Sequence, residues 1–188
     1  MRRHFYYYNI MDGHLFEAFE VFGGLANKDV LVIGSNIPWY ESNCVVRGAK
    51  TTTLEYLPRF YDHPSMSNVM VGSQLNDMLE SGKKHDTILC ISSIEHDGLG
   101  RYGDPINPNA DLETMHGMKS MLVRGGLLYI SFPVGRDAVV WTACRVYATA
   151  PFLQYVYVTF GQVWRAEDTT PVQRLDFTRR VRSAGRGV

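Results

Sequence analysis

The run Val30-Leu31-Val32-Ile33 is wholly apolar and ends at Gly34. Four consecutive apolar residues are typical of a central parallel strand that is buried on both faces of a sheet. The glycine permits a tight turn after the strand, and Pro38 is suited to the first turn of a following helix. We therefore predict a strand, a turn and a helix over residues 30–47, with Gly48 ending the helix.

Short apolar runs alternate with helical patterns along most of the chain. This alternation favours an α/β fold of the Rossmann-like, doubly wound kind, in which a mostly parallel sheet lies between helices. An N-terminal helix would pack beside the sheet. The strands after the first are expected at Thr51–Leu54, Val69–Val71, Thr87–Ile91 and Leu127–Phe132, and the helices at His14–Ala26, Tyr40–Arg47, Leu75–Leu79 and Leu112–Leu122.

The composition is that of one globular domain. The chain has 188 residues, of which 45% are hydrophobic and 20% charged, and its formal net charge is zero. A neutral chain has no overall field that would draw it to nucleic acid or to an anionic membrane, so neither partner is expected. Three widely spaced cysteines, Cys44, Cys90 and Cys144, form neither a disulfide framework nor a zinc cluster. Because the N-terminus lacks the apolar run of a secretory signal, we expect a cytoplasmic protein.

Residues 146–164 form an uncharged segment close to the length of a membrane helix. Pro151 and Gly161 interrupt this segment, so a buried helix and strand are favoured over a membrane span. The arginine-rich end of the chain is expected to be a loose tail, with docking on an anion as the alternative. The chain is accordingly divided into a helical extension at 1–28, a Rossmann-like domain at 29–164 and an Arg-rich tail at 165–188.

Glu55 follows Gly34 by 21 residues and lies at the end of the second expected strand. An acid at about this spacing hydrogen-bonds the ribose hydroxyls in nucleoside-binding folds. A pyrophosphate cofactor such as NAD would need a Gly-x-Gly-x-x-Gly turn, whereas this turn has one glycine and a bulky Trp39. A nucleoside without a pyrophosphate therefore fits better. On these residues alone, a solvated strand end is an equal alternative for Glu55, and core packing is favoured over adenine stacking for Trp39.

The loop after the strand Thr87–Ile91 has the strongest site signal in the chain. Its segment Ser93–Pro105 combines three glycines with charged and aromatic side chains, in a position where ligands bind in α/β sheets. The segment Asp104–Asp111 is rich in oxygen ligands, but Pro105 and Pro108 break the spacing of a calcium-binding loop. We therefore predict a ligand-binding loop without a metal.

Within this loop the residue types suggest individual roles. Glu95 and His96 are expected either on the cofactor side or in proton handling. A histidine near its ordinary pKa can act as a general base at neutral pH, so for proton handling we expect His96 as the base, with Glu95 or Asp104 orienting it. Arg101 offers a planar fork of donors for an anionic or carbonyl group of a substrate, with Tyr102 beside it. The purely structural alternative is that Asp104 and Arg101 only clip the loop together.

Two sets of motifs resemble known families. Glu95-His96 after a strand, and the segment Leu122–Gly126 before the next one, are similar to the second half of class I S-adenosylmethionine-dependent methyltransferases. Three further segments, Ile33–Glu41, Leu54–Tyr56 and Ser93–Pro105, resemble nearly residue by residue the domain of unknown function 268 family, a methyltransferase-like group.

This resemblance implies a sheet of the class I methyltransferase type, which could be incomplete at its C-terminus, and S-adenosyl-L-methionine as the cofactor. It places the cofactor contacts at Gly34, Ser35, Glu55 and Ser93. It also places the acceptor loop, which includes all the candidate catalytic and substrate-binding residues, at Glu95–Asp104.

The sequence thus predicts an S-adenosyl-L-methionine-dependent methyltransferase that acts on a small-molecule acceptor. The alternative is a catalytically silent Rossmann-like binding or scaffold protein. The family's Asn-Ala-His-Arg segment is replaced here by Thr142-Ala143-Cys144-Arg145, which favours the silent protein. The intact Glu55 and the intact loop Glu95–Pro105 favour the enzyme. A nicotinamide-dependent oxidoreductase is disfavoured by the single glycine of the first turn.

Overall fold

The computed structural model describes residues 7–8, 10–70, 79–147 and 162–165. Its centre is a six-stranded sheet in the order β3-β2-β1-β4-β5-β8. The first five of these strands are parallel, and β8 is antiparallel to β5. This is the mostly parallel sheet that the sequence predicts. The strands are β1 (Asp29–Ile33), β2 (Lys50–Glu55), β3 (Met66–Met70), β4 (His85–Ile91), β5 (Leu122–Ser131) and β8 (Gln162–Arg165).

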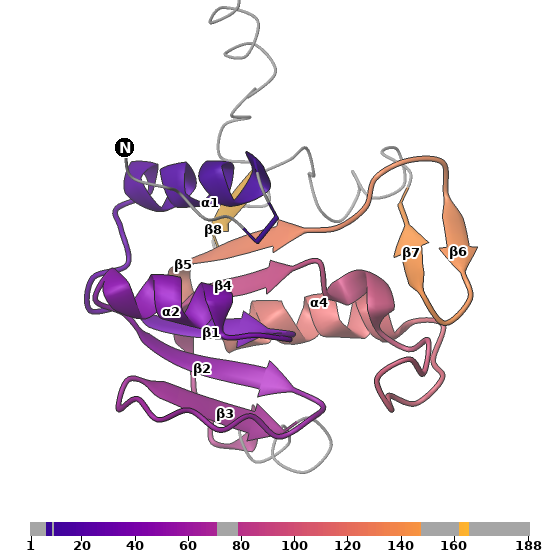
Figure 1. Ribbon diagram of the computed structural model, residues 1–188, viewed down its shortest axis with the longest axis horizontal. Helices are drawn as coiled ribbons and strands as arrows, with labels where there is room; N and C mark the ends of the chain where they lie inside the picture. Colours follow the sequence, from indigo (N-terminus) through magenta and orange to yellow (C-terminus); the bar gives the residue numbers. More distant parts are fainter. Residues whose placement is uncertain (1–6, 9, 71–78, 148–161, 166–188) are drawn as a thin grey trace, which may run out of the picture.

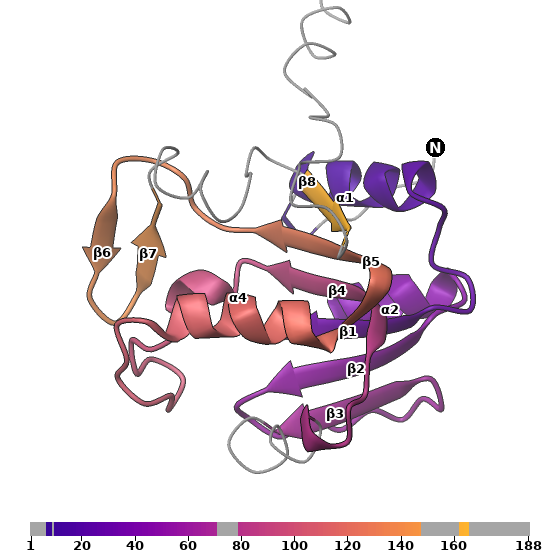
Figure 2. The same ribbon diagram turned by 180° about the vertical axis from the view of Figure 1, so that it is seen from behind.

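Helices cover both faces of the sheet. α1 (Ile10–Val21) and α2 (Trp39–Val46) lie on one face, and α4 (Ala110–Met121) lies on the other (Figures 1 and 2). Alternate residues of β1 therefore belong to different apolar clusters: Val30 packs in the cluster under α1 and α2, and Leu31 in the cluster under α4. Both side chains are fully buried. The apolar run of β1 is a strand buried on both faces, as predicted.

α1 lies closer to the N-terminus than the predicted helix His14–Ala26, which was wrong at both ends. The cause at the C-terminal end is local, since Gly23 and Gly24 adopt positive φ angles of 94° and 70° and end the helix. At the other end, the buried carboxylate of Asp12 accepts a 2.8 Å hydrogen bond from the hydroxyl of Tyr40 on α2. This bond fixes the N-terminal helix against the domain.

The predicted turn at Leu122–Gly126 is part of β5. Leu122 pairs with His85 and Leu127 pairs with Thr87, and the register shifts between these two pairs. α4 therefore runs directly into a strand that starts earlier than predicted and contains an irregularity where the glycines stand. The sequence pattern did not predict this early start, because the residues between Leu122 and Leu127 outnumber those between their partners on β4 and so break the regular strand pattern.

The remaining strands were predicted with mixed accuracy. β2 extends one residue beyond the predicted Thr51–Leu54 at each end. β4 begins at His85, before the predicted Thr87, and β3 begins at Met66, before the predicted Val69. The predicted helix Leu75–Leu79 lies almost wholly outside the described residues, as does the tail at 165–188. A hairpin formed by β6 (Ala138–Val140) and β7 (Cys144–Val146) was not predicted.

The uncharged segment 146–164 also falls mostly outside the described residues. Among the helices that the structure does describe, none is long and apolar enough to cross a membrane.

Candidate functional site

The loops after β1 and β4 touch at the carboxyl edge of the sheet. Gly34, directly after β1, has a φ angle of 71°, and a Cβ atom built on it would lie 2.1 Å from the Oγ atom of Ser93. Only a glycine allows this close approach, because any side chain would collide with Ser93. The structure thus brings together two of the predicted cofactor-binding residues, Gly34 and Ser93.

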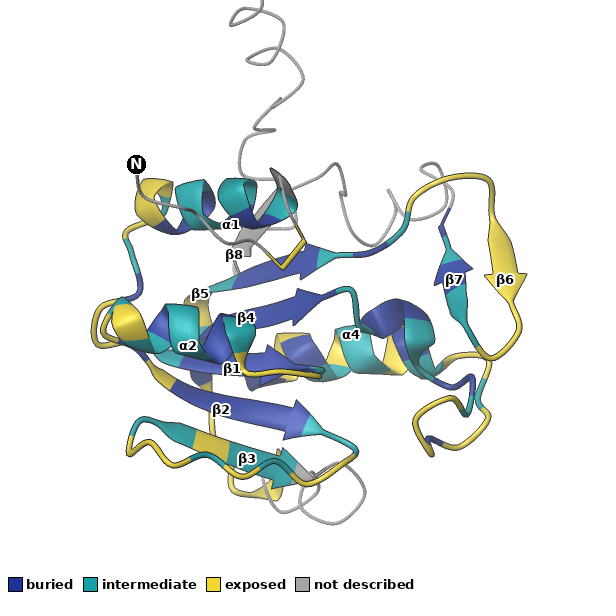
Figure 3. Cartoon of the chain, in the orientation of Figure 1, coloured by how far each residue is buried: buried dark blue, intermediate teal, exposed yellow. Residues whose placement is uncertain are grey.

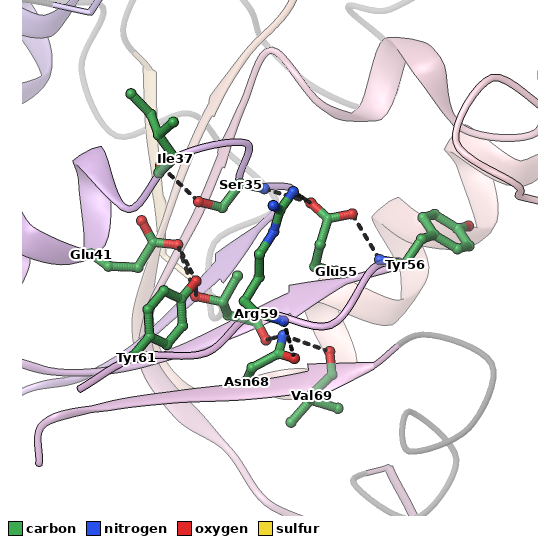
Figure 4. Close-up of polar contacts among 10 residues, drawn as sticks. Ser35, Ile37, Glu41, Glu55, Tyr56, Arg59, Tyr61, Asn68 and Val69 are labelled. Atoms are coloured by element: carbon green, nitrogen blue, oxygen red, sulfur yellow. Dashed lines mark hydrogen bonds and ion pairs between the residues drawn. The ribbon is translucent and has the colours of Figure 1, made fainter. Parts of the chain in front are cut away.

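Glu55 lies at the same edge, at the end of β2, with only 12% of its side chain exposed. Its Oε2 atom accepts a 2.8 Å hydrogen bond from the backbone N–H of Ser35, and its Oε1 atom accepts a 2.7 Å bond from the N–H of Tyr56 (Figure 4). The guanidinium of Arg59 lies beside it, with Nη2 at 3.8 Å from Oε2. Each carboxylate oxygen can accept a second hydrogen bond, so this held carboxylate keeps acceptor capacity for a ligand.

The contact between Gly34 and Ser93 gives a direct test of this edge. We expect Gly34→Ala to lower the free energy of unfolding by about 2–4 kcal/mol, through the unfavourable φ angle and the collision with Ser93. Gly103→Ala is the matched control, because Gly103 also has a positive φ angle, 86°, but a Cβ there would meet nothing within 4 Å. Urea unfolding should show a smaller loss for Gly103→Ala, and Ser93→Gly should partly rescue Gly34→Ala. A rescue of zero would contradict the close approach.

Glu95 is buried behind the loop after β4. It stands in the short helix η1 (Ile94–His96), is 1% exposed, and its Oε1 atom accepts a 2.6 Å hydrogen bond from the hydroxyl of Ser92. Ser92 has a φ angle of 49°, which is uncommon for a residue other than glycine and costs about 1–3 kcal/mol. Among the described residues, the Oε2 atom of Glu95 has no hydrogen-bond partner. Burial raises the pKa of Glu95, so its neutral form is favoured more than that of an ordinary glutamate.

His96 is oriented by the backbone of the hairpin. Its Nδ1 atom is hydrogen-bonded to the carbonyl oxygen of Ala143. A carbonyl only accepts, so Nδ1 donates, and in the neutral ring the Nε2 atom carries the lone pair. That Nε2 atom lies 3.7 Å from the Oε1 atom of Glu95. Glu95 and His96 are therefore neighbours, but at a separation longer than a hydrogen bond.

Asp104 is not paired with His96 by any hydrogen bond or ion pair that the described part of the chain shows. Its two oxygens instead accept hydrogen bonds from the N–H groups of Gly100, at 3.0 Å, and Tyr102, at 3.1 Å. Burial alone would raise the pKa of Asp104, but these N–H groups outweigh burial and hold its pKa below the usual range. The geometry favours the structural alternative for this residue, that it clips the loop.

Arg101 and Tyr102, the predicted substrate-binding residues, lie on the exposed side of the loop. The guanidinium of Arg101 lies 5.9 Å from the centre of the Tyr102 ring and donates a 3.4 Å hydrogen bond to the carbonyl of Thr142. The Tyr102 ring meets the His96 ring edge to face, with 5.6 Å between their centres. These two side chains therefore stand next to the candidate base.

Arg145 on β7 holds the loop in place and had no predicted role. Its guanidinium donates hydrogen bonds to the carbonyl of Asp97 and, at 3.4 Å each, to the carbonyls of Asn107 and Pro108. Its Nε atom lies 3.6 Å from a carboxylate oxygen of Asp111. One sequence signal pointed to Arg145: the arginine is one of the residues that the segment Thr142–Arg145 shares with the family pattern.

Asp97 gives the loop a predictable pH dependence. Burial raises its pKa to about 6, even though Thr114 donates a 2.7 Å hydrogen bond to it. An unfolded aspartate has a pKa of about 3.9, so between these two values the folded protein binds the extra proton. Its stabilising contribution is then complete below about pH 4 and is lost as the pH rises through about 6, a total of up to about 3 kcal/mol.

We expect Asp97→Asn to remove that loss, since the amide stays neutral and still accepts from Thr114. Urea unfolding from pH 4 to pH 8 should show stability falling more steeply in the wild type than in the variant. Equal slopes would mean that the carboxyl of Asp97 is solvated in solution.

Among residues 7–8, 10–70, 79–147 and 162–165, no group of three or more His, Cys, Asp or Glu side chains is placed to hold a metal ion. Trp39 packs partly buried against the cluster under α1 and α2, as favoured from the sequence. The four cofactor residues predicted from the resemblance all lie at the carboxyl edge of β1, β2 and β4.

Comparison with known proteins identifies the family. The profile of DUF268, described as a Caenorhabditis protein of unknown function, matches residues 27–174. The chain belongs to this family. No curated protein matches the sequence.

Solved structures identify the fold as Rossmann-like, of the class I methyltransferase type. The 1,6-didemethyltoxoflavin-N1-methyltransferase of Burkholderia thailandensis, solved with S-adenosylhomocysteine, is similar with a TM-score of 0.56 at 14% identity, covering 77% of this chain and 64% of that one. The candidate methyltransferase yhhF of Escherichia coli has a TM-score of 0.50 at 12% identity, with 72% and 74% covered. NodS of Bradyrhizobium japonicum, an N-methyltransferase, has a TM-score of 0.47 at 16% identity, with 64% and 59% covered. The chain therefore spans less than two thirds of the toxoflavin enzyme and of NodS.

Proposed function

We propose that this protein is an S-adenosyl-L-methionine-dependent methyltransferase that acts on a small-molecule acceptor. The observation that carries the proposal is Glu55, a carboxylate held by two backbone N–H groups at the carboxyl edge of the sheet with acceptor capacity left on both oxygens. That is where a ribose binds in a doubly wound fold. The fold supports the same cofactor class.

The residues fit a nucleoside that carries no pyrophosphate. Gly34 is the one glycine that directly follows β1, and its open side is limited by the contact with Ser93. A ligand can therefore approach the backbone closely at Gly34 alone. A pyrophosphate would need close approach along a whole Gly-x-Gly-x-x-Gly turn. Glu55 would hold the ribose hydroxyls, while Gly34, Ser35 and Ser93 would form the wall beside it. S-adenosyl-L-methionine supplies a methyl group on a positively charged sulfur, which is a good leaving group.

The protein's own part in the reaction would be to align the acceptor and to remove its proton. His96 is suited to that task because the Ala143 carbonyl fixes its ring with the Nε2 lone pair free to accept. In its ionised form, the nearby Glu95 would stabilise the charge that His96 then gains, since Oε1 lies 3.7 Å from Nε2. Asp104 would act only by holding the loop that carries Arg101 and Tyr102.

The test is calorimetric titration of the purified full chain with S-adenosylmethionine, S-adenosylhomocysteine and NAD. We expect micromolar binding of the first two and none of NAD, because only the first two lack a pyrophosphate. A folded sample that binds none of the three would overturn the proposal and favour the catalytically silent alternative. Binding of NAD alone would favour an oxidoreductase.

A further inference from the structure

The β6–β7 hairpin and the loop after β4 form one unit at the carboxyl edge of the sheet. Hydrogen bonds join them: the carbonyls of Ala143 and Thr142 bond to His96 and Arg101. The guanidinium of Arg145 donates to the carbonyls of Asp97, Asn107 and Pro108. Figures 1 and 2 show the hairpin standing apart from the sheet beside this loop. The hairpin is thus fixed next to the candidate base.

This unit exposes apolar and aromatic side chains. Figure 3 shows β6 exposed along its whole length, and Trp141, at the tip of the hairpin, is 64% exposed. Tyr102 and Ile106 on the facing loop are also about half exposed or more, at 48% and 61%. Exposed apolar groups gathered beside polar ones mark a binding surface more often than a random part of the surface does.

The backbone at the hairpin tip is also held in an unfavourable conformation. Thr142 has a φ angle of 58°, which is rare for a β-branched residue, and its carbonyl accepts the Arg101 bond. Ser92, the other strained residue of this edge, supports Glu95. Strain of this kind persists at ligand sites, where the surrounding structure over-determines it.

We propose that the hairpin tip and the loop at Arg101 and Tyr102 form the acceptor site, and that the acceptor is a planar aromatic compound with an anionic group and an ionisable hydroxyl. This inference rests on the proposed methyltransferase function. Trp141 and Tyr102 supply aromatic surface, on which a flat ring system packs better than a saturated one. Arg101, already beside the Tyr102 ring, supplies the cation for the anionic group. His96 lies behind them to accept the hydroxyl proton.

The test uses 6-hydroxy-2-naphthoate as the probe, and its binding to the full chain is measured by ligand-observed NMR. Its saturated analogue, 6-hydroxydecahydro-2-naphthoate, lacks the flat ring, and 2-naphthol lacks the anion. We expect each analogue to bind about tenfold more weakly than the probe, since one aromatic contact or one ion pair is lost.

Two variants assign the site. Trp141→Ala should weaken the probe about tenfold and reduce its advantage over the saturated analogue, and Arg101→Gln should remove its advantage over 2-naphthol. Val46→Ala is the control, because Val46 is an exposed apolar residue of α2, outside this unit. Unchanged circular dichroism of the three variants shows that they fold.

The outcomes separate this inference from the proposed function. Binding of S-adenosylhomocysteine without binding of the probe would overturn the aromatic acceptor and leave the methyltransferase standing. Binding of the probe at Trp141 without binding of S-adenosylhomocysteine would overturn the methyltransferase and leave an aromatic binding site that is not an acceptor site. Equal binding of the saturated analogue would overturn the aromatic acceptor. Sedimentation with phosphatidylglycerol vesicles in place of probe binding would mean that the exposed groups meet a lipid surface.

Discussion

Glu55→Ala should weaken the binding of S-adenosylhomocysteine by about 100-fold or more. A hydrogen bond to a charged group contributes about 1.5–3 kcal/mol, and Glu55 has room for two from the ribose hydroxyls. The substitution also releases the N–H of Ser35, which now donates to Oε2 and so fixes the turn after β1. Calorimetry of the wild type and the variant at the same pH measures the loss directly.

Two further variants separate the charge of Glu55 from the shape of the site. Glu55→Gln keeps an acceptor oxygen but loses the charge, so its loss should be smaller than that of Glu55→Ala. Arg59→Ala removes the cation at 3.8 Å from Oε2 without touching the carboxylate, and should leave binding within about threefold of the wild type. If Glu55→Ala binds as the wild type does while remaining folded, Glu55 is only a strand end and the cofactor site lies elsewhere.

The parts of the fold that the sequence predicted are those with a local cause. The apolar run of β1 is buried on both faces because four consecutive side chains are apolar, and the turn after it forms because glycine tolerates the φ angle of 71° at Gly34. By contrast, the early start of β5 depends on the pairing of Leu122 with His85, a residue far away in the sequence. No periodicity within β5 could show that pairing.

The candidate site divides in the same way. The residue types at Glu55, Glu95 and His96 were visible from their places after strands, since strand ends meet at one edge of a parallel sheet. The orientation of His96 was not, because it depends on the backbone carbonyl of Ala143 in a hairpin that no local pattern indicated. For Asp104 the sequence left two roles open, and only the two backbone N–H contacts of its carboxylate favour one of them.

Arg145→Ala should lower the free energy of unfolding by about 3–5 kcal/mol, because it leaves a buried carboxylate without its charged partner. The Asp111 carboxylate would keep the 2.9 Å hydrogen bond from the hydroxyl of Tyr147 and the 3.0 Å bond from the N–H of Leu112, but no cation, and three loop carbonyls would lose the donor that Arg145 supplies. Arg145→Lys keeps the charge but loses the planar fork of donors, so its free energy of unfolding should lie between those of the wild type and Arg145→Ala. Urea unfolding at neutral pH gives the comparison.

Arg101→Ala is the matched control for Arg145→Ala, since the exposed Arg101 makes a single 3.4 Å bond to the same hairpin. Its effect on stability should stay within about 0.5 kcal/mol, as for most surface substitutions. Hydrogen exchange should locate the difference: the amides of residues 97–109 should exchange faster in Arg145→Ala, while those of β1 keep their protection. Binding of S-adenosylhomocysteine should change little, because no described contact joins Arg145 to Gly34 or Glu55. Equal stability of Arg145→Ala and Arg101→Ala would show that the hairpin does not hold the loop. The side chains of the proposed acceptor site would then not be held in fixed positions relative to one another.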